Sequence, residues 1–592
     1  MNKCFILLLL ILSVYTGKAQ TIQKNEQDLS IIENIPKESI FVHFNTSLLF
    51  VGEYLYYKLY CINNSTSLFS DLSKVAYIEL VGENKNIVFK QKILLENGLG
   101  NGDFFIPSEV PSGNYKLIAY TNWMKNEGVN SFFQNDITII NPYQSDQKAI
   151  REIPENFQDS VPENSTLKKE KPSLYKANTN SSDLNNVSLS LNKTLFEKRD
   201  EVLLSIKTVN SQIKKGSYSL SVRKINALPA FDKKSILDFE TSTKSQSFVQ
   251  NSTIFLPELR GELIKGRVLN LTDNKPLQNI KVVLSIPNES YQFYYATTNE
   301  NGIFYMNLDK KHNNNKGYIQ VLDDKRDLYN IQLEEPDLID YSDLNFKKYS
   351  LSTNMEHLIL ERSIHNQIEN AFFSFRPDSI VVANNSIPFK KSNIITYNLD
   401  EFIRFPTVNE TFIEIINQAW IEKISTDNYT FNVKAYEKYA DSNVLPLVLI
   451  DGTIVHNHNE ILSLSAFALK SISIIRDKYI FGTKLYKGII SFETINGDFS
   501  NLKTINAAKY IDLFSPQPNK KYYKQTYETQ SQKENRLPDD RIQLLWIPNL
   551  KDNLTTNINF FTSDISGEFE ITIEGFTDDG LPIYIQQQFT VE

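Results

Sequence analysis

The feature that most constrains the fold is a repeated alternation of apolar and polar residues in short runs, with turn residues about every ten positions. It spans Ile40 to Tyr143, returns from Val187, and appears again in the last 50 or so residues. Successive side chains on a strand point to opposite faces, so this alternation predicts half-buried strands. Aromatic residues make up 12% of the chain and glycine only 20 positions, a composition typical of β-sandwiches. The sequence therefore predicts a mainly β protein built from tandem immunoglobulin-like sandwiches.

The N-terminus has the pattern of a secretory signal. Lys3 precedes an apolar run from Phe5 to Val14, and Gly17 and Ala19 are small residues at the expected cleavage site. We therefore expect residues 1–19 to be a signal peptide and the chain to be exported, periplasmic or at the cell surface. The run is shorter than the roughly 20 residues that span a bilayer, so no integral membrane segment is expected.

Composition narrows the class of protein further. Once the signal is removed, Cys61 is the only cysteine, so no internal disulfide can form and stability must come from buried cores. At about 100 to 200 residues per domain, a chain of 592 residues allows several domains. The net charge of -8 and the absence of a Lys/Arg stripe argue against nucleic acid as a partner.

The alternation divides the chain into segments. We expect a first sandwich over 38–143 and a linker over 144–183, where the residues become polar and rich in proline. A second sandwich-like module is expected over 184–251 and a third module over 256–340, with Asn301-Gly302 as a hairpin turn.

The remaining segments mix helix and strand. An α+β module is expected over 350–500, with helices over 355–373 and 411–424. Its Asp451-Gly452 turn suits a type I′ hairpin, and helix followed by strand is expected over 461–477. Residues 519–538 are expected to form a loop. The strands of 540–592 are expected to be able to complete an earlier sandwich.

Three segments carry resemblances to known families. The order VHFN, VGEYLYYK and GNGDFFIPSEVPSGNYKLIAYTNWMKN over the first sandwich is similar to the macroglobulin-type domain of alpha-macroglobulins and of large exported Bacteroidota proteins. The run LPELRGELIKGRVLN with ATTNENGIFYMNL resembles a carboxypeptidase regulatory-like, or transthyretin-like, domain. The stretch from Leu445 to Thr494 resembles the plug domain of TonB-dependent outer-membrane receptors, although Tyr479 to Thr483 departs from the family motif.

These resemblances imply a location and a class of function. Too few residues follow Thr494 to build a transporter barrel, so we expect a plug-like module without its own barrel. The implied function is a non-enzymatic accessory protein that binds an outer-membrane β-barrel or another envelope protein during transport, secretion or barrel assembly. The alternative is a surface or periplasmic protein that captures a peptide, a glycan or a protease. An enzyme with an unrecognised site is a third alternative.

No motif predicts catalysis. The sequence contains no G-x-S-x-G, H-E-x-x-H or G-x-x-x-x-G-K-[ST], and Cys61 has no glutamine partner for the thioester of alpha-macroglobulins. Cys61 alternates with apolar strand residues, so a buried, unreactive thiol is expected. The carboxylate pairs Glu334-Glu335 and Asp578-Asp579 lack the facing geometry of a glycosidase. We therefore expect no catalytic residue and no cofactor.

A few histidines and tryptophans remain as candidates for binding. His456, His458 and Glu460 could supply three donors to a divalent metal, or they could be solvated residues at a hairpin end, and this choice stays open. His43 is expected to be packed in a strand. The other candidates are expected to be satisfied or surface histidines and core tryptophans, namely His312, His357 and His365, and Trp123, Trp420 and Trp546.

Overall fold

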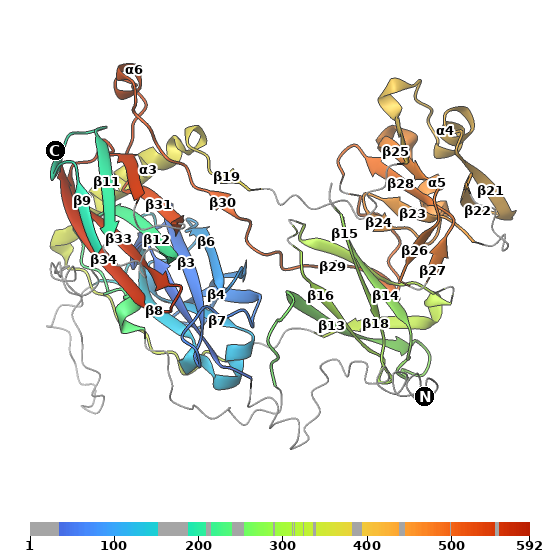
Figure 1. The fold of residues 1–592 in the computed structure, drawn as a ribbon, viewed down its shortest axis with the longest axis horizontal. Coiled ribbons are helices and arrows are strands. Elements are labelled where there is room, and N and C mark those ends of the chain that lie inside the picture. The colour runs from blue at the N-terminus through green and yellow to red at the C-terminus, as the bar shows by residue number, and fades with distance from the viewer. Residues whose placement is uncertain are drawn as a thin grey trace, which may run out of the picture. The chain divides into compact units, whose positions relative to one another are not determined.

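A computed structural model describes residues 35–151, 187–208, 215–239, 254–287, 291–310, 312, 314–323, 325–334, 339–381, 393–436, 444–482, 484–497, 499–550 and 556–592. The chain divides into two compact units (Figure 1). Unit 1 comprises Met1–Leu259, Ile339–Ile380 and Asn519–Glu592, and unit 2 comprises Arg260–Leu338 and Val381–Pro518. Each unit therefore contains segments that are distant in the sequence.

The first sandwich of unit 1 packs a three-stranded sheet, order β1-β3-β6, against a five-stranded sheet, order β2-β8-β7-β4-β5. Alternating apolar residues on both inner faces fill its core, including Phe41, Leu59 and Leu117. The strands are β1 (Glu38–Phe44), β2 (Leu48–Phe50), β3 (Tyr54–Asn63), β4 (Val75–Gly82), β5 (Ile87–Leu94), β6 (Leu99–Phe105), β7 (Gly113–Thr121) and β8 (Phe133–Ile140).

The second sandwich of unit 1 combines strands from residues 187–224 with strands from residues 543–591. One sheet has the order β10-β34-β33-β12-β31 and the other β32-β11-β9. The early strands are β9 (Val187–Leu191), β10 (Leu195–Phe196), β11 (Glu201–Thr208) and β12 (Gly216–Lys224), and the late ones are β31 (Gln543–Leu550), β32 (Thr556–Phe561), β33 (Gly567–Thr577) and β34 (Pro582–Val591). Central strand β12 pairs with β31 on one side and with β33 on the other, so residues 543–591 supply half of this module.

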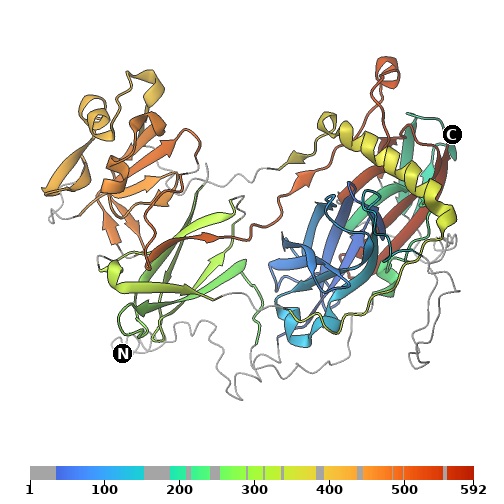
Figure 2. The same ribbon diagram turned by 180° about the vertical axis from the view of Figure 1, so that it is seen from behind.

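One long helix, α3 (Glu356–Ala371), belongs to unit 1, and Figure 2 shows it in front of the sandwich strands. Its side chains contact the β2–β3 turn of the first sandwich through Asn366 and Asn370. Beyond it, β19 (Ser379–Ile380) pairs with β30 (Lys520–Lys521), and the short helix α6 (Gln530–Lys533) precedes β31. Helix α3 therefore packs on unit 1 together with strands that come before and after it in the sequence.

Unit 2 begins with a smaller sandwich. Its sheets have the orders β16-β13-β18 and β15-β14-β17-β29. The strands are β13 (Glu262–Asn270), β14 (Lys281–Ile286), β15 (Gln292–Thr297), β16 (Ile303–Leu308), β17 (Lys316–Val321), β18 (Tyr329–Leu333) and β29 (Ala508–Asp512). Strand β29 comes from well beyond the expected 256–340 segment and pairs antiparallel with β17.

The α+β module of unit 2 is built on a mixed sheet, order β20-β25-β28-β23-β24, in which β23 and β28 run parallel. Its strands are β20 (Ile394–Asn398), β23 (Leu447–Ile450), β24 (Thr453–Ile454), β25 (Leu469–Ile475) and β28 (Ile489–Thr494). Helices α4 (Val408–Glu414) and α5 (Asn459–Leu462), and the hairpins β21 (Ala419–Ser425) with β22 (Asn428–Val433) and β26 (Tyr479–Phe481) with β27 (Lys484–Tyr486), complete the module.

The predicted fold class is confirmed, because the structure is mainly β with sandwich modules and one α+β module. The Asp451-Gly452 turn joins β23 to β24 with φ of 45° and 78°, as a type I′ hairpin requires. The helix expected over 355–373 is α3, and helix followed by strand occurs as α5 and β25.

Two local predictions are wrong. The helix expected over 411–424 ends at Glu414, and Ala419 to Ser425 form strand β21, because β22 offers that strand an antiparallel partner. The Asn301-Gly302 turn joins β15 to β16, which lie in different sheets, so it is a crossover between sheets and not a hairpin.

Some expectations concern residues outside the described part of the chain. They are the signal peptide, residues 152–183 of the expected linker and the end of the second module at 251. In the described part, no helix is long and apolar enough to cross a membrane.

Candidate functional site

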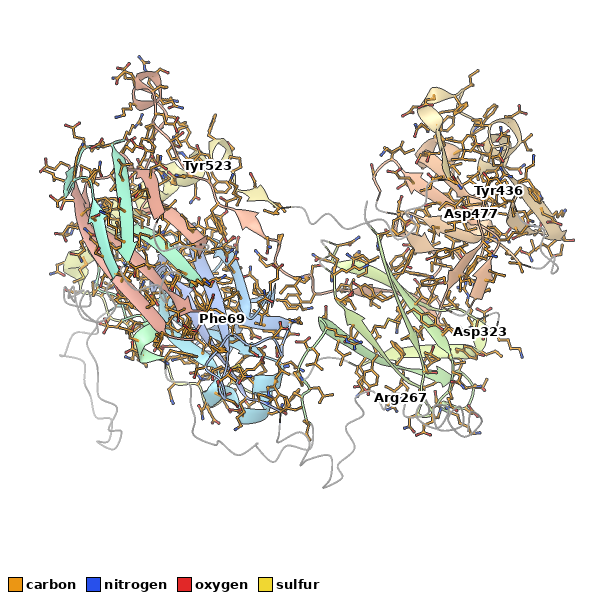
Figure 3. All side chains as sticks on the ribbon, viewed as in Figure 1. Phe69, Arg267, Asp323, Tyr436, Asp477 and Tyr523 are labelled. Atoms are coloured by element: carbon orange, nitrogen blue, oxygen red, sulfur yellow. The ribbon has the colours of Figure 1, made fainter. Side chains whose placement is uncertain are left out.

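Unit 1 contains a cavity of about 130 Å³ between helix α3, the start of β3 and the segment that leads into β31. Charged side chains and aromatic rings both line it. The charged residues are Glu53, Arg223, Arg362, Glu369, Arg376, Asp378, Asp540 and Arg541, and the aromatic ones are Tyr54, Tyr56, Phe373, Tyr522, Tyr523 (labelled in Figure 3) and Trp546. These residues come from four segments of the sequence, 52–56, 223, 362–378 and 522–546, that fold together only in the native unit.

The Gly52-Glu53 turn lets α3 approach the first sandwich closely. Gly52 has a φ of +88°, and a Cβ there would lie 2.7 Å from Asn370 Nδ2 and 2.9 Å from Asn366 Nδ2. Those amides donate hydrogen bonds to the carbonyls of Gly52, at 3.0 Å, and Val51, at 2.6 Å. The glycine is therefore required both by the backbone conformation and by the space that α3 occupies.

Glu53 is the centre of a buried charge network. Its carboxylate accepts two hydrogen bonds from Arg362, at 2.8 and 2.7 Å, and lies 3.4 Å from Arg223 Nη2. Arg362 also donates to Asn226 Oδ1 and to the Leu48 carbonyl. Burial opposes ionisation of Glu53, but the two guanidiniums outweigh it and hold its pKa below 4.5. The Arg362 guanidinium thus links α3 to both sandwiches of unit 1.

A second charged cluster closes the other end of the cavity. Arg376 binds both oxygens of Glu369, at 2.9 and 2.8 Å, and Arg541 binds both oxygens of Asp539, at 2.6 Å each. Burial raises the pKa of Glu369 despite Arg376. In this cluster each arginine binds both oxygens of one carboxylate, and Arg376 Nη1 also lies 3.8 Å from Asp539 Oδ1, whereas Arg223 and Arg362 share Glu53.

Two residues that line the cavity carry buried N–H groups without a hydrogen-bond partner among the described residues. They are Trp546 Nε1 and Arg223 Nε, on residues that are 5% and 7% exposed. The Trp546 ring lies against Tyr56, with ring centroids 5.9 Å apart and planes 26° from parallel. Tyr54 stacks in the same way on Phe373. Paired aromatic rings therefore form part of the cavity wall, beside the charged groups.

A separate buried pair lies between the two sandwiches. His43 Nδ1 is 2.6 Å from Ser219 Oγ, and its Nε2 is 3.8 Å from Glu574 Oε1. Burial, with a smaller effect of Lys233, lowers the pKa of His43 well below 6.5, and burial raises the pKa of Glu574 to about 7. His43 is packed between sheets, as expected from its place in a strand.

Two of the three donors of the hypothesised metal site, His458 and Glu460, have other hydrogen-bond partners. His458 Nδ1 is 2.8 Å from Thr430 Oγ1 and accepts the Phe431 N–H, while the Glu460 carboxylate accepts the Lys503 N–H. Burial lowers the pKa of His458 to about 4. Within the described ranges, no group of three or more His, Cys, Asp or Glu side chains is arranged to hold a metal ion.

Other candidates have structural surroundings. The prediction that Cys61 is buried is confirmed, and burial followed by Glu38 raises the pKa of its thiol. Trp123 and Trp546 are buried as expected, but Trp420 is 44% exposed on β21, so the core assignment is wrong for it. His312 is buried beside Ser515 and Asn314.

His365 is a satisfied histidine, as expected, because on α3 its Nδ1 lies 2.8 Å from Asp540 Oδ2. The cavity itself was missed by sequence reasoning because Glu53, Arg223, Arg362 and Arg541 stand in separate runs. The sequence held one local signal for this cavity, the glycine that precedes Glu53.

Exposed large apolar side chains gather on the α+β module. Among the described residues, twelve lie between 393 and 497, against four between 35 and 143 in the first sandwich, although both segments are about equally long. The twelve are Ile394, Phe402, Ile403, Ile413, Trp420, Ile424, Tyr436 (Figure 3), Leu445, Phe467, Ile480, Leu485 and Ile495. Single exposed apolar residues are ordinary, so the density is the informative feature.

Four of these residues lie on three segments whose backbones are hydrogen-bonded to one another, and we call them the apolar rim: Phe402, Ile403, Phe467 and Ile495. Three backbone segments meet there, because Ala466 donates to the Pro406 carbonyl and Ile495 donates to the Ala468 carbonyl. Arg404 donates to the Leu469 carbonyl at 2.9 Å and ties the first segment to the second. The side chains are 41%, 84%, 51% and 60% exposed.

Comparison with known proteins gives weak structural likenesses. No protein-family model matches the chain, and no curated protein matches it. Salmonella alpha-2-macroglobulin reacted with methylamine is 11% identical, with a TM-score of 0.22, over 94% of this chain and 39% of that one. Trypsin-activated alpha-2-macroglobulin from Escherichia coli is 9% identical, with a TM-score of 0.22, over 94% and 41%.

Dimeric latent PorU from Porphyromonas gingivalis is 12% identical, with a TM-score of 0.14, over 51% of this chain and 34% of that one. These TM-scores are far below 0.5, so the likenesses assign no function. The chain spans about 40% of the length of the two alpha-2-macroglobulins.

Proposed function

We propose that this chain is a non-enzymatic, exported accessory protein that binds a partner protein at the outer membrane, as part of a transport, secretion or barrel-assembly complex. The observation that carries the proposal is the apolar rim of the α+β module. Ile403 alone is 84% exposed, and hydrogen bonds from Arg404 tie its segment to the one that carries Phe467. Contiguous exposed apolar side chains are characteristic of protein interaction sites.

The location in this proposal rests on the sequence resemblances. The signal-like N-terminus favours export, and the plug-like order of Leu445 to Thr494 favours an outer-membrane setting. The parallel pairing of β23 with β28 and the Asp451-Gly452 hairpin are compatible with a plug-like module. The sandwich of β13 to β18 with β29 is compatible with a carboxypeptidase regulatory-like domain, and the first sandwich with a macroglobulin-type domain.

The geometry of the rim suggests how a partner binds. Its four side chains are apolar, while Arg404 beside them is held by Asp400 and by backbone carbonyls. A partner with a complementary apolar patch would cover the rim and leave the charged edge in water, as in other protein interfaces. Burial of Ile403 and Phe467 would supply most of the affinity.

The test is a pull-down in mild detergent from the native outer membrane, comparing the wild type with Ile403→Asp. A charge at the centre of an apolar contact should reduce recovery of the partner at least about tenfold. Leu581→Asp is the matched control, because Leu581 is 50% exposed on a turn of unit 1. Equal recovery of the partner by the wild type and Ile403→Asp would contradict a role for the rim. Recovery of the wild type without any partner would favour the ligand-capture alternative.

A further inference from the structure

The cavity of unit 1, which the proposed function does not use, has a carboxylate on its wall with no cation bound to it. Asp378 Oδ1 accepts the Tyr523 N–H at 2.8 Å, and no donor of the described residues reaches Oδ2. Asp378 is half-buried and Oδ2 keeps accessible surface, so this oxygen is open to a ligand. Lys520 acts on Asp378 only from a distance, because its ammonium is bound to Asp103 at 2.8 Å.

The arginines on the same wall are already neutralised by carboxylates of the protein. The pairs are Arg223 and Arg362 with Glu53, Arg376 with Glu369, and Arg541 with Asp539. Asp540 is hydrogen-bonded to His365. Four guanidiniums therefore stand against five carboxylates once Asp378 and Asp540 are counted, and this balance favours a cation as the ligand.

Aromatic rings form the rest of the wall beside Asp378. Phe373 and Tyr523 are 39% and 38% exposed, and Tyr54 stacks on Phe373 with ring centroids 5.8 Å apart. The Tyr522 ring stands at 90° to that of Tyr56, with centroids 5.2 Å apart, so the wall presents rings in two orientations. The face of an aromatic ring carries partial negative charge and attracts a cation within about 6 Å of its centroid.

The carboxylate lies close to these rings. Its charge acts on the Tyr54 hydroxyl, since burial and then the charges of Asp103 and Asp378 raise the pKa of Tyr54 to about 12. The cavity volume of about 130 Å³ is roughly ten times what one water molecule needs. Aromatic rings beside a compensating negative charge suit an alkylated ammonium group. We propose that the cavity binds a small organic ammonium ion, with its charged head between Asp378 and the rings of Tyr54 and Phe373.

Calorimetric titration of the full chain with choline chloride tests the proposal. The neutral probe is neohexyl alcohol, in which a tert-butyl group replaces the trimethylammonium group, and potassium chloride is the control for ionic strength. Choline should bind in the millimolar range or more tightly. The alcohol should bind at least about tenfold more weakly, because it has the same shape but no charge to attract Asp378 and the ring faces. Equal binding of the two probes, or no binding of millimolar choline, would overturn the proposal.

Two variants test the residues that hold the charge. Asp378→Asn keeps an oxygen for the Tyr523 N–H but removes the negative charge, and should weaken choline binding about tenfold. Asp71→Asn is the matched control, because the Asp71 side chain is 69% exposed outside the cavity, and it should leave the affinity unchanged. Phe373→Leu serves in case Asp378→Asn does not fold, and loss of the ring should weaken choline binding about threefold. Wild-type affinity for choline in either folded variant would contradict the assignment.

Discussion

Replacing Arg362 by methionine should destabilise unit 1 strongly. The substitution removes both bonds to Glu53, at 2.8 and 2.7 Å, and the bonds to Asn226 and to the Leu48 carbonyl. Removing one partner of a buried ion pair typically costs about 3 to 5 kcal/mol, because the other charge stays buried. Arg223 still lies 3.4 Å from Glu53 and compensates part of that charge. We therefore expect a loss near the lower value, about 3 kcal/mol.

Denaturant unfolding followed by tryptophan fluorescence measures this loss. In a Trp420→Phe background the two remaining tryptophans, Trp123 and Trp546, both lie in unit 1, so the signal reports that unit alone. The control is Lys193→Met, which removes an exposed pair with Asp200 and should not shift the transition measurably. A shift for Arg362→Met no larger than that of the control would refute the reasoning.

The pH dependence gives an independent check on the same pair. The pKa of Glu53 is lowered in the folded state, so its contribution is present above the unfolded pKa of about 4.5 and is lost as pH falls through the folded pKa. The difference between the wild type and Arg362→Met should therefore shrink below about pH 4. A difference that grows on acidification would show that another group is responsible.

Two further predictions concern the same unit. Gly52→Ala should cost about 2 to 3 kcal/mol, because alanine is strained at φ +88° and its Cβ displaces the amides of Asn366 and Asn370; an unchanged unfolding midpoint would contradict this. Glu574→Gln tests a buried carboxyl, and burial raises the pKa of this carboxyl to about 7. The titratable groups around it are His43, Lys233, Asp238 and Glu570, and the Ile236 N–H donates a hydrogen bond to it. A raised acid pKa means that stability is full below about pH 4.5 and is lost as pH rises through about 7. The variant should therefore gain up to about 3 kcal/mol on the wild type between pH 5 and pH 8, measured by denaturant titration, and a constant difference would contradict the shift.

Local sequence patterns predicted the turns and helices that depend mainly on neighbouring residues in the sequence. The Asp451-Gly452 turn forms a tight hairpin because its two residues accept positive φ, and the helix expected over 355–373 is present as α3, although Ile364 on it is 47% exposed. The segment 411–424 shows the limit of this reasoning. Its residues suit a helix. Pairing with strand β22 nevertheless stabilises Ala419–Ser425 as a strand by more than their intrinsic preference favours a helix.

Long-range pairing could not be predicted from a single sequence. Strand β29 joins a sheet whose other members end nearly two hundred residues earlier, and β12 takes partners from beyond residue 540. The charge network has the same origin, since Glu53 and Arg362 are 309 residues apart. Each residue alone reads as an ordinary surface charge, and only the fold brings them into one cavity.

The central claim is that the chain binds a partner protein through the apolar rim of its α+β module. The most direct test is quantitative mass spectrometry of proteins recovered with tagged wild type and with Ile403→Asp from the native outer membrane. We predict one envelope protein in stoichiometric amount with the wild type, and a loss of at least about tenfold with Ile403→Asp while Leu581→Asp retains it. Recovery of the wild type with no stoichiometric partner, or equal recovery of a partner by all three, would contradict the claim.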